Sequence, residues 1–289
     1  MPVWWRSIPL LPAICLLALF FVGPIFWAFY GSFTNMALTG PHAQSVDFVG
    51  LDNYFRLAAD PAFPLALWLT IVFVVTSAII GQNVLGMVIA VLLLKASKGV
   101  AAVTRTIVVL TWILPELVAA FVTYAYFNKD GTFNQILAMV GIRGVDWLFN
   151  VPMLAIILGN TWRGTAFSMM VYQAALGGVS TDLTEAAMID GANARQRYFR
   201  VVLPIIRGTV GTNTMLITLQ TLAVFTLIWV VTAGGPLNAS TTLPVLAYQQ
   251  AFKFGDIGYG TAIAAVMLLV GAAFAVIYVR TLRPGRLSS

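Results

Sequence analysis

The chain has 289 residues, of which 60% are hydrophobic and only 9% are charged. Soluble globular domains carry about 25% charged residues, so this composition excludes a fold solvated by water and predicts a protein embedded in lipid. The net charge of +6 comes from basic residues spread over short loops beside apolar segments, which does not indicate binding to nucleic acid. The single cysteine, Cys15, excludes an internal disulfide and a multi-cysteine metal site.

Six apolar segments are long enough to cross a bilayer, which takes about 20 helical residues. Lipid leaves no backbone polar group unpaired, and no alternating barrel pattern is present, so each segment is expected to be helical. The sequence therefore predicts an all-α integral membrane protein with six transmembrane helices in a single domain over residues 1–289. The expected spans are 8–33, 66–94, 104–127, 153–178, 208–231 and 260–281.

The basic residues lie mainly on one side of these spans. Cytoplasmic loops carry the excess of Lys and Arg, so this side is expected to be cytoplasmic. It holds both termini and the loop between the fourth and fifth spans, and the chain is predicted to be a multi-pass protein of the cytoplasmic membrane. The basic residues on this side are Arg6, Lys95, Lys98, Arg105, Arg195, Arg197, Arg200, Arg207, Arg280, Arg283 and Arg286.

The loop at 182–204, between the fourth and fifth spans, has its own helical pattern. Asp182 is expected to cap a helix start, with Glu185 completing a capping box, and Gly191 is expected to end the helix in the left-handed conformation. A second short amphipathic helix is expected over 194–202, with Pro204 ending it near the membrane. The loop either lies on anionic lipid or docks on a soluble partner.

Four polar residues within the spans are candidates for function, because such groups are costly in lipid. Glu116 and Arg163 form either an ion pair that joins two helices, or a polar patch that lines a water-filled cavity, or both. For Gln82 and Asn83 in the second span, hydrogen bonds between helices are the favoured interpretation. No Walker-type nucleotide-binding sequence is present, so the chain is not expected to hydrolyse ATP.

Several stretches resemble the membrane subunits of bacterial ABC importers. The loop sequence E-A-A-x-x-D-G-A resembles the EAA loop of that family, and further stretches resemble its carbohydrate-uptake branch, similar to maltose- and glycerol-phosphate-type permeases. These stretches are Glu185-Ala186-Ala187, Asp190-Gly191, Leu203-Pro204, Gly50-Leu51-Asp52-Asn53-Tyr54, Asn160-Thr161-Trp162 and Gly234-Gly235-Pro236.

The resemblance implies that the loop is a coupling helix seated on a separate ATPase subunit. Glu185 would contact a basic group of the ATPase, Ala186 and Ala187 would permit close packing, and Gly191 would make the turn that follows Asp190. Many relatives have a proline near the start of this segment, where this chain has Ser180-Thr181-Asp182, and side-chain capping is expected to replace it.

The resemblance also implies partners and a solute site. The partners are an ATPase dimer, a second permease subunit and an extracytoplasmic substrate-binding protein, with membrane lipid around the spans. No cofactor is expected in this chain, because ATP and Mg would be bound by the ATPase. Together with Glu116, the candidate cavity residues are Arg163, Gly164, Phe167, Gln220, Thr221 and Val224, and Trp112 could add an aromatic face.

The predicted function is therefore that of a non-catalytic permease subunit of a type I ABC importer, which moves a sugar or related polar solute by alternating access. Two alternatives stay open from the sequence. One is a secondary transporter or channel without an ATPase, although Glu116 is the sole carboxylate expected within a span. The other is a membrane scaffold that binds a soluble partner through the same loop.

Overall fold

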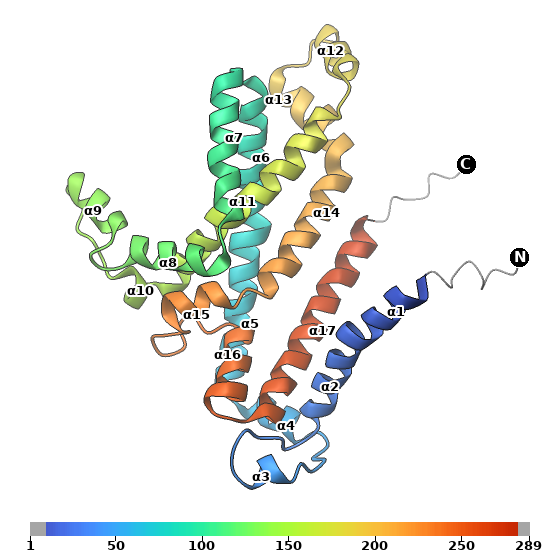
Figure 1. The fold of residues 1–289 in the computed structure, drawn as a ribbon. Helices are drawn as coiled ribbons and strands as arrows, with labels where there is room; N and C mark the ends of the chain where they lie inside the picture. Colours follow the sequence, from blue (N-terminus) through green and yellow to red (C-terminus); the bar gives the residue numbers. More distant parts are fainter. Residues whose placement is uncertain (1–9, 283–289) are drawn as a thin grey trace, which may run out of the picture. The chain divides into compact units, whose positions relative to one another are not determined.

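The structure is a computed structural model that describes residues 10–282 (Figure 1). In this range the chain is mainly helical, and its β-bridges are the two isolated pairs Thr34–Phe48 and Ala37–Asp256. The chain falls into two compact units. Unit 1 comprises residues 1–65 and 243–270, and unit 2 comprises 66–242 and 271–289. Two of the three boundaries lie within the helices α5 and α17, and the third directly precedes α16.

Unit 1 contains the N-terminal helix, the first loop and the start of the last long helix. A π-helical segment, η2, interrupts the N-terminal helix, and a second one, η5, follows α16. The elements are α1 (Leu11–Leu17), η2 (Ala18–Val22), α2 (Gly23–Ser32), α3 (Pro41–Gln44), α4 (Asp52–Ala59), the start of α5 (Ala62–Phe73), α16 (Leu243–Tyr248), η5 (Gln249–Lys253) and the first half of α17 (Ile257–Leu282).

A cluster of polar contacts joins α4 to the start of α17 within unit 1. Arg56 forms an ion pair with Asp256 at 2.5 Å, and its guanidinium lies 4.2 Å from the centre of the Tyr259 ring. The Tyr259 hydroxyl donates to the carboxylate of Asp60 at 2.7 Å. Asn53 donates from its side chain to two backbone carbonyls at the end of the N-terminal helix. The first loop is therefore tied to α17 by specific side chains.

Unit 2 contains the remaining helices, including a third π segment inside the second long helix and a fourth at the start of the fifth. The elements are η3 (Val74–Gln82), α6 (Asn83–Lys95), α7 (Lys98–Ile113), α8 (Glu116–Phe127), α9 (Thr132–Met139), α10 (Trp147–Asn150), α11 (Pro152–Gly177), α12 (Thr181–Ile189), α13 (Ala194–Arg197), η4 (Tyr198–Val202), α14 (Leu203–Leu222) and α15 (Thr226–Thr232), with the rest of α5 and α17.

Helix α11 is the centre of unit 2. It packs against η3, α6, α7 and α14, and Figure 1 shows it running obliquely across them. Ile156, Met169 and Tyr172 are completely buried on it. Gly86 allows α6 to approach closely, because a Cβ atom there would lie 2.5 Å from the Cβ of Ser168. Small residues at the contact between membrane helices let the backbones pack in this way.

A buried polar network ties α6, α11 and α14 together. The Asn83 side-chain oxygen accepts from the Tyr172 hydroxyl, from Asn213 Nδ2 at 3.0 Å and from the Thr214 hydroxyl at 3.3 Å. Asn213 also donates to Ser168 Oγ at 3.0 Å. The predicted hydrogen bonding of Asn83 between helices is confirmed. Its own amide donates to the carbonyls of Ala78 and Ile79 in the middle of η3, so the network also includes the π segment.

Among the described residues, four helices are long and apolar enough to cross a membrane. They are Leu11–Ser32, Ala62–Lys95, Ala194–Leu222 and Ile257–Arg280. A bent pair, Lys98–Ile113 with Glu116–Met139, provides a fifth candidate. The first corresponds to the predicted span 8–33, whose first two residues lie outside the described range.

Two predicted spans differ from the helices in the structure. The span expected at 104–127 is not one helix, because the chain bends by 106° between α7 and α8. Leu114 and Pro115 have extended backbone there, since a proline disfavours helical conformation in the residue before it. The span expected at 208–231 starts earlier and ends earlier, because the helix runs continuously over Ala194–Leu222 and breaks before α15.

Helix α11 corresponds to the predicted span 153–178 but is absent from the apolar candidates. Its 26 residues give it a length of about 39 Å, enough to cross a bilayer. It carries Asn160, Thr161 and Arg163 near its middle, and these lower its apolar character. Its polar side chains face other helices, where the first two are buried.

Candidate functional site

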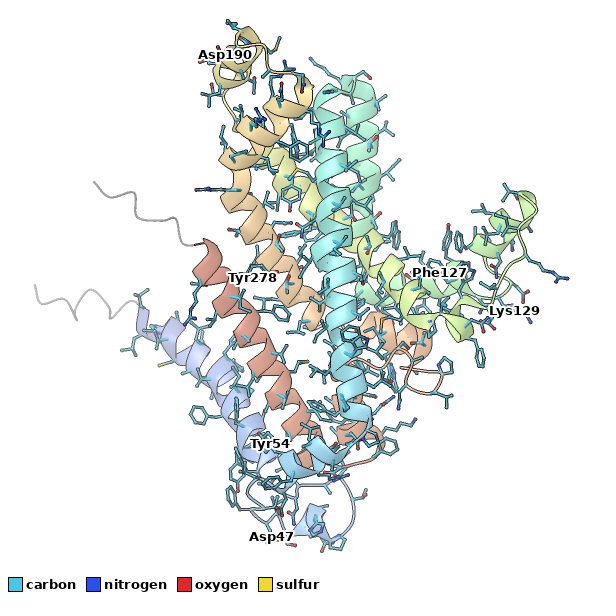
Figure 2. All side chains as sticks on the ribbon, turned by 180° about the vertical axis from the view of Figure 1, so that it is seen from behind. Asp47, Tyr54, Phe127, Lys129, Asp190 and Tyr278 are labelled. Carbon is cyan, nitrogen blue, oxygen red and sulfur yellow. The ribbon has the colours of Figure 1, made fainter. Side chains whose placement is uncertain are left out.

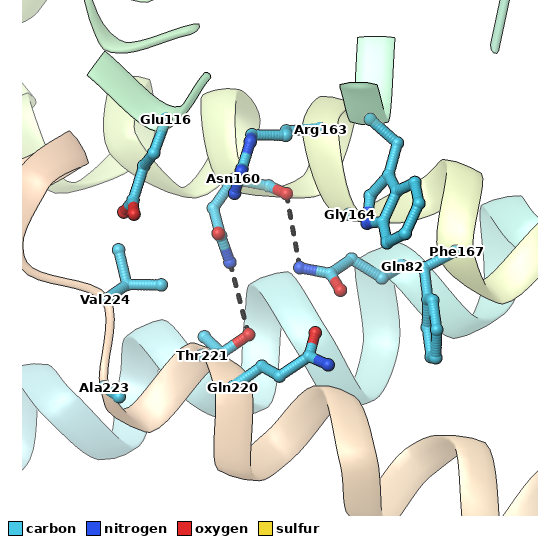
Figure 3. A pocket seen from close by; sticks show the side chains of 11 residues that line it. Gln82, Glu116, Asn160, Arg163, Gly164, Phe167, Gln220, Thr221, Ala223 and Val224 are labelled. Carbon is cyan, nitrogen blue, oxygen red and sulfur yellow. Dashed lines mark hydrogen bonds between the residues drawn. The ribbon is translucent and has the colours of Figure 1, made fainter. Parts of the chain in front are cut away.

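A cavity of about 380 Å³ lies inside unit 2, where α7, α8, α11 and α14 meet the end of η3. It is lined by both charged and aromatic side chains (Figure 3). Such a combination is unusual in a chain that is otherwise apolar. The lining residues are Gln82, Trp112, Glu116, Asn160, Arg163, Gly164, Phe167, Gln220, Thr221, Ala223 and Val224.

Two amide side chains of the cavity wall are fixed by their own hydrogen bonds. Gln82 donates from Nε2 to the backbone carbonyl of Asn160 at 3.2 Å. Asn160 donates from Nδ2 to Ser77 Oγ at 2.8 Å and to Thr221 Oγ1 at 3.5 Å. Figure 3 shows the contacts of Asn160 with Gln82 and with Thr221, which link η3, α11 and α14. Because the amide nitrogens are engaged, the side-chain oxygens are the acceptors left for a ligand.

Gly164 lets the Gln82 side chain lie across α11. A Cβ atom at this position would collide with the Gln82 amide group. Glycine is therefore required at position 164 because the Gln82 side chain approaches its backbone closely. Backbone conformation does not require it, since its φ angle is not in the left-handed region. The predicted interhelical bonding of Gln82 is confirmed, and Gln82 in addition lines the cavity.

Glu116 and Arg163 both line the cavity but do not form an ion pair. Within residues 10–282 the structure contains one ion pair, between Arg56 and Asp256. The predicted alternative of a Glu116–Arg163 pair joining two helices is therefore wrong, because the Glu116 carboxylate and the Arg163 guanidinium do not come within ion-pair distance. Glu116 lies in the first turn of α8, where the helix dipole favours a negative charge.

Two aromatic rings complete the cavity wall. The ring centroids of Trp112 and Phe167 are 6.1 Å apart, with a tilt of 32°. Trp112 comes from α7 and Phe167 from α11, one turn beyond Arg163. Rings of this kind present an apolar face on which a ring of a small solute can stack.

All seven residues predicted for the cavity line it in the structure: Glu116, Arg163, Gly164, Phe167, Gln220, Thr221 and Val224. Their role in binding solute stays a prediction. Asn160 was not predicted to line the cavity, although the spacing of Asn160, Arg163, Gly164 and Phe167 places all four on one helix face. Val224 lies just past the end of α14, in the break before α15.

The second candidate region is the helix α12, which carries the EAA residues. It is solvent-exposed, with Ile189 exposed by 88% and Met188 by 55%, and Glu185 and Ala186 are exposed as well. Its neighbours within unit 2 are α13 and η4. Asp190 follows the helix and lies on the loop at the tip of the unit (Figure 2).

The two ends of α12 are set by local backbone chemistry. Gly191 has a φ of +79°, so the predicted left-handed end is confirmed, and the amide of Ala192 donates to the carbonyl of Ala187 as in a Schellman motif. The Ser180 side chain accepts from the amide of Asp182 at 3.2 Å. Side-chain capping in place of proline is therefore confirmed, but the capping residue is Ser180, and the expected cap at Asp182 is wrong.

The second short helix expected in this loop is the beginning of the long helix that contains α14. Asn193 and Gln196 form a reciprocal capping box at 2.8 and 2.9 Å that starts α13, and the chain continues through η4 into α14. Pro204 was expected to end a helix, but the helix continues through it. The proline lies inside the continuous helix Ala194–Leu222, just after the π-helical segment η4.

Comparison with known proteins agrees with these features. Residues 82–287 match the family described as binding-protein-dependent transport system inner membrane component. The chain is 31% identical over 275 residues to the trehalose/maltose transport system permease protein MalF of Thermococcus litoralis, covering 94% of this chain and 91% of that protein. It is 30% identical to the sulfoquinovosyl glycerol transport system permease protein SmoG of Agrobacterium fabrum, covering 95% and 89%.

The fold has a counterpart of known structure. A chain of the bacterial alginate ABC transporter, solved in complex with a periplasmic protein bound to alginate pentasaccharide, superposes with a TM-score of 0.82. The match covers 97% of this chain and 94% of that chain at 22% identity, which shows a shared fold.

This chain belongs to the family of binding-protein-dependent inner membrane transport components. It is a multi-pass transmembrane permease subunit of an ABC importer, and the resemblance to carbohydrate-type permeases is confirmed.

Proposed function

We propose that this permease translocates a sugar or a related polar solute through the cavity of unit 2. The observation that carries the proposal is the composition of the cavity wall. It combines fixed amides, two charged groups and two aromatic rings, which are the contacts that hydroxyl-rich rings require. The named relatives, which carry trehalose/maltose and sulfoquinovosyl glycerol, support the same class of solute.

In this proposal the whole chain is one transmembrane domain that crosses the membrane six times. The four apolar helices and the bent pair α7–α8 supply five crossings, and α11 supplies the sixth. The length of α11 supports this crossing. Its polar residues are compatible with a membrane span, because they face neighbouring helices and the cavity. Both termini then lie in the cytoplasm, in agreement with the distribution of basic residues.

The conformational change driven by ATP hydrolysis would be transmitted to the cavity through α12. We infer that Glu185, Ala186, Ala187, Asp190 and Gly191 form the surface that meets a separate ATPase subunit. The exposed face of α12 and its two capped ends support this role, because a short rigid helix transmits displacement. ATP and Mg would be bound by an ATPase dimer, a second permease subunit would complete the pathway, and an extracytoplasmic binding protein would deliver the solute.

The experiment that tests the solute site compares two threonines on α14. Thr221 lines the cavity, whereas Thr212 is exposed and bonds only to the carbonyl of Gly208. The complete importer is reconstituted in proteoliposomes with its binding protein, and uptake of a set of radiolabelled mono- and disaccharides is measured. Thr221→Val should lower uptake of the transported sugar by roughly 2- to 10-fold through the lost hydrogen bond.

Thr212→Val is the matched control and should transport like the unmodified importer. Equal uptake by both variants, or uptake of none of the sugars by the unmodified importer, would contradict the proposed solute site.

A further inference from the structure

The cavity contains a cation without a partner. The Nε atom of Arg163 is buried and has no hydrogen-bond partner in the structure. An arginine side chain cannot lose its proton, so its charge persists at this depth. A charge within a membrane span is costly and is normally paired or functional.

The groups around Arg163 are engaged elsewhere. The carbonyls of Gln220 and Thr221, at the end of α14, already accept from the amides of Ala223 at 3.2 Å and Val224 at 3.1 Å. The carbonyl of Asn160 accepts from Gln82. Glu116 lies at the start of α8, whose dipole is favourable for a carboxylate. Of the two charged groups in the cavity, Arg163 is therefore the one that has a buried polar atom without a partner among the described residues.

The remaining polar atoms of the wall are mostly acceptors. The side-chain oxygens of Gln82 and Asn160 are left free because their nitrogens donate to fixed partners. The Glu116 carboxylate is also an acceptor. Acceptor atoms can form hydrogen bonds with the hydroxyl groups of a sugar. The guanidinium of Arg163 can instead bind an oxyanion through a bidentate hydrogen bond from two of its N–H groups.

From this arrangement we infer that the preferred solute is an acidic sugar, whose carboxylate or other oxyanion binds Arg163 while its hydroxyls bind the surrounding oxygens. Trp112 and Phe167 would receive the face of the sugar ring. The inference rests on the proposed function, because it takes the cavity to be the solute site. It narrows the class of solute from polar sugars in general to those that carry a negative charge.

The test measures binding to the complete importer in nanodiscs by saturation-transfer NMR, which detects weak ligands. The probes are sodium glucuronate and glucose, which differ in one carboxylate. Glucuronate should bind about tenfold more tightly than glucose, as expected for a charge-assisted hydrogen bond. Arg163→Gln should remove that preference, and Arg163→Lys should keep part of it, because lysine retains the charge but not the planar fork.

Arg207→Gln is the matched control. It removes the same charge from α14 at an exposed position outside the cavity, and the preference for glucuronate should persist. Equal binding of both probes to the unmodified importer, or an intact preference in Arg163→Gln, would overturn the inference while sugar binding in the cavity stands. Binding of neither probe would overturn the inference and the proposed solute site together.

Discussion

The cavity wall and the helix α12 hold their functional side chains in opposite ways. In the cavity, Gln82 and Asn160 are buried and fixed by hydrogen bonds that cross between helices. On α12, Glu185 and Ala186 are exposed, and the helix is defined by Ser180 at one end and Gly191 at the other.

The difference separates two kinds of sensitivity. A change at Gln82 or Asn160 disturbs neighbouring helices, because each of these amides has a partner that would be left unsatisfied. A change on α12 leaves the packing of unit 2 intact but alters the shape presented to a partner. Substitutions in the two regions should therefore separate recognition of solute from coupling to ATP hydrolysis.

The largest effect is expected from Gly191→Pro. Proline cannot adopt the φ of +79° found at this position, and its nitrogen cannot donate to the carbonyl of Met188. The end of α12 should then rearrange, at a cost of about 2 kcal/mol or more. Uptake by the reconstituted importer should be lost, while the melting temperature of the purified protein should fall by only about 4–8 °C, so that it stays folded at the assay temperature.

Gly191→Asn provides the control for this variant, because asparagine tolerates the left-handed conformation. It should retain most of the uptake. Normal uptake by Gly191→Pro would show that the end of α12 plays no part in coupling.

A smaller effect, on the cavity alone, is expected from Gly164→Ala. The added methyl group would collide with the Gln82 amide and break its bond to the carbonyl of Asn160. Loss of one such buried contact is worth roughly 1 kcal/mol, so uptake should fall about fivefold at low solute concentration. Gly177→Ala is matched to it on the same helix, because a Cβ atom there meets nothing within 4 Å. Equal uptake by the two variants would contradict the importance of the Gln82 position.

The smallest effect on transport is expected from Asn213→Leu in the buried network. The variant removes donors to Asn83 and Ser168 without touching the cavity or α12. Hydrogen bonds between membrane helices contribute about 1 kcal/mol, so the melting temperature should fall by about 2–4 °C while the KM for solute is unchanged. The exposed Asn150→Leu should leave the melting temperature unchanged. A lowered affinity for solute in Asn213→Leu would mean that this network takes part in recognition.

Much of the cavity could be predicted because its polar residues stand out in an apolar chain. Glu116 and Arg163 are conspicuous for this reason, and resemblance to known permeases indicated Gln220 and the others. Asn160 was missed as a lining residue because its sequence stretch was treated as a family marker, and its position on the face of Arg163 was not considered. The absence of an ion pair between Glu116 and Arg163 could not be predicted, since it depends on the directions of two side chains.

The helix boundaries were harder to predict from hydropathy. Residues 104–127 are apolar on both sides of Pro115, so a hydropathy window passes over the bend. The helix start at Ala194 was predicted, but its continuity with the fifth span was not, because three arginines interrupt the apolar run and Pro204 was expected to end the helix. Local capping chemistry, more than apolar length, determines where these helices begin.

The bend between α7 and α8 has a mechanical consequence. Trp112 lies two residues before the extended pair Leu114–Pro115, and Glu116 directly follows it. Both side chains line the cavity. If the backbone of this pair rotated, it would act as a hinge that changes the width of the cavity without breaking the hydrogen bonds inside the two helices.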